Sequence, residues 1–217
     1  KKEIQRLESR LNKISEGVLK AFPGLGFSFM ISATTSFISA SDKPKRRAIK
    51  SYCFLENGSK KRSITRSAKV IDDVACFVKP GEVACIWTDD KENPFYETCH
   101  QAYGILEKAT DAKGRKLKIH KLTMPKVPTV ISGDFAIDVV EGTLPREDGD
   151  IAIASYMNFL IVNDGVIVPQ YNDEYDSLAL EQIQGIFPDS KVVGVDTWEV
   201  AYGGGNIHCI TQQQPKV

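Results

Sequence analysis

A cysteine and a histidine lie next to each other just after a run of three glycines, residues 203–205. Glycine has no side chain, so another group can approach this backbone closely. The following residues, 206–211, predict a strand in which successive side chains point to opposite faces. Cys209 would then face away from the side that His208 and Ile210 share. A thiol beside a glycine loop can meet a small ligand and act as a nucleophile, although a lone cysteine is more often a buried structural residue.

The thirteen residues around this cysteine, GGGNIHCITQQQP at 203–215, resemble the C-terminal motif of the agmatine deiminases. That family belongs to the pentein superfamily of guanidine-modifying enzymes. A match of this length with so few apolar residues is not expected by chance. The resemblance covers residues 71–217, with further matching stretches at 76–81, 87–90, 111–116, 154–159, 165–170 and 187–189.

The resemblance implies that Cys209 is the catalytic nucleophile, which attacks the guanidinium carbon of agmatine. Ammonia would leave, and water would release N-carbamoylputrescine from an amidino-cysteine intermediate, a step in putrescine and polyamine synthesis. This chemistry requires no metal and no organic cofactor. A bacterial-type protein-arginine deiminase is the alternative enzyme, and the motif around Cys209 favours the small guanidine agmatine as substrate.

A second family motif, Asn-Gly-His-x-Asp-Asn before a strand, carries the proton-transferring histidine and a carboxylate that binds the guanidinium. The corresponding stretch here is residues 68–73. Asp72 matches the binding carboxylate, which would hold the substrate by charge-assisted hydrogen bonds; a solvated carboxylate at a strand end is the alternative interpretation. Val70 replaces the histidine and cannot carry a proton, so we expect at most trace activity.

The remaining features leave two non-enzymatic alternatives open. His100 and His120 match no functional position of the family, and His208 is expected to face away from the site. The carboxylate motifs of the family's first half are not found in residues 1–69. The chain could therefore be an inactive pentein fragment that acts as a binding or oligomerising module. The other alternative is a nucleic-acid-binding basic segment carried on a deiminase-like body.

Charge divides the chain at about residue 70, although the formal net charge is zero. Residues 1–69 have a net charge of +11, and residues 70–217 have a net charge of −11. This asymmetry predicts two segments: a basic leader, residues 1–69, and the C-terminal part of a pentein deiminase domain, residues 70–217. The leader could be a divergent segment, a truncation product or a mistranslated gene model.

The basic leader contains one clear pattern. Apolar residues from Ile4 to Val18 recur at spacings of three and four, which predicts a helix over 1–22. It would pack on a domain or form a short coiled-coil seam in a homodimer. The lysine and arginine clusters within 40–69 favour a solvated segment, so no nucleic-acid partner is expected.

Cysteine usage and hydropathy indicate the compartment. Five cysteines occur without a Cys-x-x-Cys pair, which supports neither a disulfide framework nor a zinc site. No apolar run approaches 18 residues, and the charged N-terminus does not resemble a signal peptide. We therefore expect a cytoplasmic protein without a membrane partner.

The elements that would position Cys209 and Asp72 form a repeat. The same order, strand-strand-helix-strand, occurs twice, with helix starts about 80 residues apart. A helical crossover favours parallel pairing of the strands it joins, which predicts an α/β fold. The resemblance implies a partial pentein α/β-propeller, in which about five such units surround a central active site. The predicted elements are strands at 74–78, 83–87 and 117–122 with a helix from Asn93, then strands at 151–162, 166–168 and 191–195 with a helix at 174–187.

Overall fold

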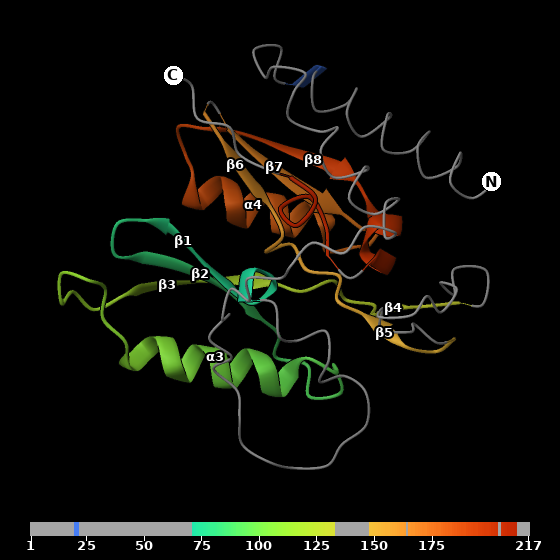
Figure 1. The fold of residues 1–217 in the computed structure, drawn as a ribbon, viewed down its shortest axis with the longest axis horizontal. Coiled ribbons are helices and arrows are strands. Elements are labelled where there is room, and N and C mark those ends of the chain that lie inside the picture. The colour runs from blue at the N-terminus through green and yellow to red at the C-terminus, as the bar shows by residue number, and fades with distance from the viewer. Residues whose placement is uncertain (1–19, 22–70, 133–147, 164, 204, 212–217) are drawn as a thin grey trace, which may run out of the picture.

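The computed structural model describes residues 20, 21, 71–132, 148–163, 165–203 and 205–211 (Figure 1). Most of the predicted 1–22 helix, the rest of the basic leader and Val70 lie outside these residues. Among the described residues, no helix is long and apolar enough to cross a membrane.

The first unit is a three-stranded sheet with one crossover helix. β1 (Ala75–Lys79) pairs antiparallel with β2 (Glu82–Trp87), and β2 pairs parallel with β3 (Lys118–Thr123). Gly81 makes the tight turn between the first two strands with a φ of +82°, which favours glycine. Helix α3 (Tyr96–Lys108) connects β2 to β3. A parallel pair requires such a long connection, because a hairpin can join only antiparallel strands.

The second unit has the same topology. β6 (Leu160–Val162) pairs antiparallel with β7 (Gly165–Gln170), and β7 pairs parallel with β8 (Lys191–Asp196) after α4 (Asp176–Ile186). The central strands β2 and β7 are almost continuously buried, as expected for strands covered on both faces. The predicted strand-strand-helix-strand order is therefore confirmed in both units.

The predicted strand at 151–162 is wrong. Only the two ends of this stretch form strands, namely β5 (Ile151–Ala152), which pairs with β4 (Thr129–Val130), and β6. Residues 153–159 between them are a buried loop. Side-chain hydrogen bonds satisfy backbone polar groups of this buried loop. Ser155 Oγ accepts a hydrogen bond from the Met157 amide and donates one to the Asp73 carbonyl. An apolar stretch alone does not distinguish a buried loop of this kind from a strand.

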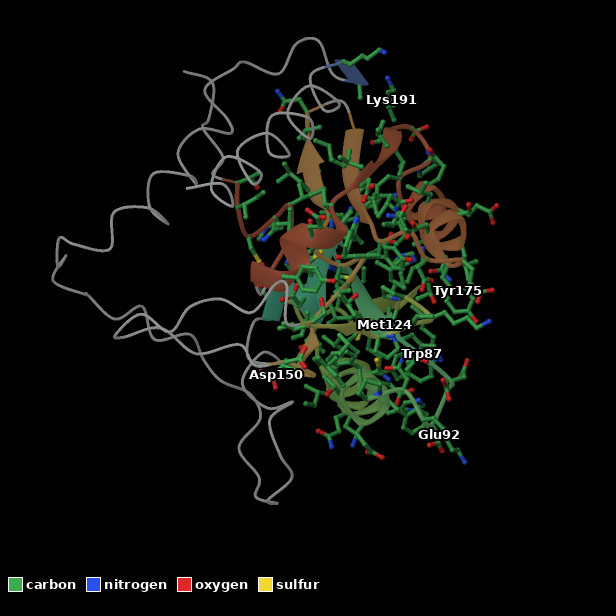
Figure 2. All side chains as sticks on the ribbon, turned by 90° about the vertical axis from the view of Figure 1, so that its right-hand side faces the viewer. Trp87, Glu92, Met124, Asp150, Tyr175 and Lys191 are labelled. Carbon is green, nitrogen blue, oxygen red and sulfur yellow. The ribbon has the colours of Figure 1, made fainter. Side chains whose placement is uncertain are left out.

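The two units share one core. Helix α4 lies between the two three-stranded sheets, and α3 covers the opposite face of the first sheet (Figure 1). Gln182 on α4 accepts a hydrogen bond from the backbone N–H of Thr123 at the end of β3. Buried Met124 lies between the two units (Figure 2). One cluster of buried apolar side chains includes Leu122 of the first unit and Ile183 of the second.

Candidate active site

The segment that carries Cys209 is a turn, so the predicted strand at 206–211 is wrong. The Ile210 amide donates to the Asn206 carbonyl at 3.1 Å, and the Thr211 amide donates to the His208 carbonyl at 3.2 Å. The side chain of Asn158 accepts hydrogen bonds from backbone amides that would bond to a neighbouring strand if this segment were extended. Its side-chain oxygen accepts hydrogen bonds from the backbone N–H groups of Asn206 (3.1 Å) and Cys209 (3.2 Å).

This turn brings both neighbouring side chains to one carboxylate. Cys209 Sγ donates to Asp72 Oδ2 at 3.3 Å, and His208 Nδ1 lies 2.8 Å from the same oxygen. The expectation that His208 faces away from the side of Cys209 was wrong. Strict alternation of faces holds for an extended strand and not for a turn.

Asp72 reaches the site from a short 3-10 helix, η3 (Ile71–Asp73), that directly precedes β1. The hydrogen bond from His208 is the main cause that lowers the pKa of Asp72, and the hydrogen bond from Cys209 lowers it further against the opposing effect of burial. Asp72 is therefore a carboxylate at neutral pH. A fixed negative charge beside a thiol is suited to bind a cation.

His208 is strongly affected by the same contact. Its hydrogen bond to Asp72, followed by its hydrogen bond to Cys209, raises the pKa of His208 to about 10. The ring is therefore an imidazolium at neutral pH. Its side chain is 50% exposed, so it can reach a molecule that enters from solvent.

Asp73 and Asn158 form the buried side of the site. Asn158 Nδ2 donates to Asp73 Oδ1 at 2.6 Å and lies 3.0 Å from Cys209 Sγ. Burial raises the pKa of Asp73 to about 6, and the hydrogen bond from Asn158 opposes this effect. Asp73 Oδ2 has no hydrogen-bond partner among the described residues. Asn158 thus links the nucleophile candidate to a buried carboxyl group.

Two further buried polar residues support this arrangement. Asn206 Nδ2 donates to the Tyr171 hydroxyl oxygen at 3.2 Å, and that hydroxyl donates to the Ser155 carbonyl at 2.9 Å. The sequence interpretation missed the positioning contacts of Asn158 and Asn206. Both residues lie in stretches that match the family motif, 154–159 and 203–215, and this match was the only signal that pointed to them.

The glycine run allows the close approach that the sequence predicted. A Cβ added at Gly205 would lie 2.7 Å from Cys209 Sγ and 2.8 Å from Cys209 Cβ. Atoms at such separations overlap, so the thiol occupies space that only glycine leaves open at this position.

The other two histidines are held elsewhere. The His100 ring packs against the rings of Trp87 and Tyr96, with centroid distances of 4.2 and 4.1 Å. His120 Nε2 pairs with Glu82 Oε2 at 2.6 Å in the first sheet. Neither residue contacts Asp72 or Cys209 in the described part of the chain.

The donor atoms of Asp72, Asp73 and Cys209 all lie within 4.8 Å of one another. These groups suit a planar guanidinium, which a carboxylate binds through parallel hydrogen bonds while the thiol faces its carbon. The site therefore has the chemical character of a cation site with an adjacent nucleophile.

Comparison with known proteins agrees with this character. Residues 45–215 match the family of Porphyromonas-type peptidyl-arginine deiminases. A relative from Enterococcus faecalis is 70% identical over 146 residues, which are 67% of this chain and 40% of that protein. The agmatine deiminase of Pseudomonas aeruginosa is 46% identical over the same length.

A solved structure of the Enterococcus faecalis agmatine deiminase superimposes with a TM-score of 0.65 at 69% identity. The aligned region is again 67% of this chain and 40% of the deiminase chain. The chain thus spans about 40% of the length of the relatives it matches. Its two described units share the α/β pentein fold of these enzymes. The chain belongs to the family of Porphyromonas-type peptidyl-arginine deiminases.

Proposed function

We propose that this chain contributes the nucleophile and a substrate-binding carboxylate of an agmatine deiminase. Such an enzyme hydrolyses agmatine to N-carbamoylputrescine and ammonia. The observation that carries the proposal is the contact of Cys209 Sγ with Asp72 Oδ2 at 3.3 Å, beside His208. The high identity to agmatine deiminases supports agmatine as the substrate.

In the proposed reaction, Asp72 binds the guanidinium by charge-assisted hydrogen bonds and orients its carbon toward Cys209. The Cys209 thiolate attacks this carbon, and the C–N bond to one terminal nitrogen breaks as ammonia leaves. Water then attacks the amidino-cysteine, and the C–S bond breaks to give the ureido product. Asn158, 3.0 Å from Sγ, fixes the position of the thiol. The proposal needs no metal or organic cofactor.

We further propose that residues 70–217 form part of a pentein propeller and that residues 1–69 are a separate basic leader. The repeated topology of the two units supports the first statement. The charge division at about residue 70 supports the second. The match to the family model begins at residue 45, so it is compatible with a separate leader over residues 1–44 and argues against one over residues 45–69.

Impaired activity is part of the proposal, since Val70 occupies the position of the family histidine. Val70 lies outside the described residues. Losing a general acid or base commonly lowers a rate by about 10²–10⁴-fold. The variant Val70→His is therefore expected to release ammonia from agmatine faster than the unchanged chain, and an equal or lower rate would show that this position is not the limiting one.

The decisive experiment is to incubate the purified chain with agmatine and measure both ammonia and the amidino adduct on Cys209 by mass spectrometry. The adduct should form in the unchanged chain and be absent from Cys209→Ala. An adduct on another cysteine, or ammonia release that persists in the alanine variant, would refute the proposal. Turnover of a peptidyl-arginine substrate in preference to agmatine would favour the protein-arginine deiminase alternative.

A further inference from the structure

Deimination needs a group that gives a proton to the departing ammonia and later takes one from water. Val70 cannot serve, because a valine side chain has no exchangeable proton. The chain contains three histidines, and all of them lie among the described residues. His100 and His120 are engaged with Trp87 and Glu82, respectively, while His208 adjoins the thiol.

We propose that His208 is the catalytic proton carrier of this chain, acting at Cys209 as a partial substitute for the histidine that Val70 replaces. This inference rests on the proposed function and adds a second reacting side chain to it. Its basis is geometric: His208 Nδ1 and Cys209 Sγ both contact Asp72 Oδ2, at 2.8 and 3.3 Å. Asp72 thereby holds the imidazole beside the atom that reacts.

The charges around His208 favour a proton donor. Asp72 and the Cys209 thiol are the groups that raise its pKa to about 10, so the ring is protonated at neutral pH. Asp73 is the other group nearby that could carry a proton, and its pKa is raised to about 6 by burial. Asp73 is only 1% exposed and is bonded to Asn158, whereas the His208 ring is half exposed and can meet the leaving nitrogen.

The proton steps balance with His208 in this role. After the thiolate attacks the guanidinium carbon, the imidazolium gives its proton to one terminal nitrogen, and ammonia departs with the electron pair of the C–N bond. The neutral imidazole then takes a proton from water as the hydroxide adds to the amidino carbon. The C–S bond breaks, the thiolate leaves with its electron pair, and the hydroxyl proton passes to solvent as the carbonyl forms. His208 is again an imidazolium.

The first test compares His208→Gln with the matched control His120→Gln, using ammonia release from agmatine. Since Val70 already removes part of the acid–base contribution, we expect kcat to fall by about tenfold in His208→Gln, with a smaller change in KM, because a proton carrier acts in the transition state. The control should stay within about twofold of the unchanged chain, a range far smaller than a general acid or base effect. Retention of kcat within about threefold in His208→Gln would overturn the proposal.

A second test follows the first half of the reaction alone. Formation of the amidino adduct on Cys209, measured by mass spectrometry within a single turnover, should be about tenfold slower in His208→Gln than in the unchanged chain and in His120→Gln, because the departing ammonia then lacks its proton donor.

The two tests separate the proposals. Equal rates of adduct formation in the unchanged chain and His208→Gln would overturn the role of His208 and leave the proposed function intact. A chain that forms no adduct with agmatine at all would refute the proposed function. A pH profile of turnover whose alkaline limb is lost in His208→Gln would support both.

Discussion

At the scale of single residues, Asp72 is the group on which the site depends. It was predicted from its place in the motif at 68–73, and the structure places its Oδ2 within hydrogen-bond distance of both His208 and Cys209. The proximity of His208 could not be predicted, because the turn that creates it is set by contacts to Asn158, a residue about 50 positions earlier. Long-range contacts of this kind leave no local pattern in a sequence.

The first prediction concerns the charge of His208. Replacing Asp72 with Asn removes the main cause of its raised pKa, so the pKa should fall from about 10 toward the ordinary value of 6.5. An NMR titration of the His208 ring measures this directly, and an unchanged titration would show that Asp72 does not hold the ring.

The contact between His208 and Asp72 also predicts that the stability of the fold depends on pH. A histidine whose pKa is raised in the folded state stabilises the fold fully below its unfolded value, and the contribution is lost as the pH rises through the folded value. For His208 the loss should therefore occur between about pH 6.5 and pH 10. Urea unfolding of the unchanged chain and His208→Gln should differ more at pH 6 than at pH 10.5, and the reverse order would contradict the assignment.

Asn158 provides a prediction about stability at a buried position. In Asn158→Leu the amides of Asn206 and Cys209 lose their acceptor, and Asp73 loses its donor. Unsatisfied buried polar groups cost about 1–3 kcal/mol each, so the loss of these three bonds should lower the free energy of unfolding by at least about 3 kcal/mol in urea titrations. A decrease below about 0.5 kcal/mol would mean that water replaces these bonds.

At the scale of elements, turn signals and helical periodicity predicted the two units correctly. Predictions of strands that relied on apolar content alone were wrong. The turn at Gly81 and the apolar faces of the two helices are local features, and the corresponding elements lie close to their predicted bounds. The strands predicted at 151–162 and 206–211 are wrong because side chains of Ser155 and Asn158 take the place of strand pairing. Apolar content reports burial and not backbone conformation.

The glycine loop gives a prediction at this scale. Gly205→Ala would place a Cβ 2.7 Å from Cys209 Sγ, whereas a Cβ at Gly203 would meet no atom within 4 Å. The first variant should move the thiol and slow the alkylation of Cys209 by iodoacetamide severalfold, and Gly203→Ala should leave the rate unchanged. Equal rates in the two variants would show that the loop adjusts without moving the Cys209 thiol.

At the scale of the whole molecule, the fold class could be predicted because a repeat with two crossover helices allows few arrangements. The packing of the two units against each other could not be predicted, because no sequence pattern indicates which face of α4 contacts the first sheet. In the structure α4 lies between the two sheets, and its buried residues belong to the same cluster as Leu122 and Ile86 of the first unit. The site itself is built across the units, with Asp72 preceding β1 and Cys209 following β8.

This shared core predicts that the two units unfold together. Ile183 on α4 is fully buried, and truncating a buried isoleucine to alanine costs about 2–5 kcal/mol. In Ile183→Ala, the slowest-exchanging amides of β2 in the first unit and β7 in the second should lose the same amount of protection in hydrogen exchange. Leu178→Ala on the same helix is the control, because that side chain is 39% exposed and its truncation should cost little. Loss of protection confined to β7 would show instead that the second unit opens separately, in which case Asp72 and Cys209 would part whenever it does.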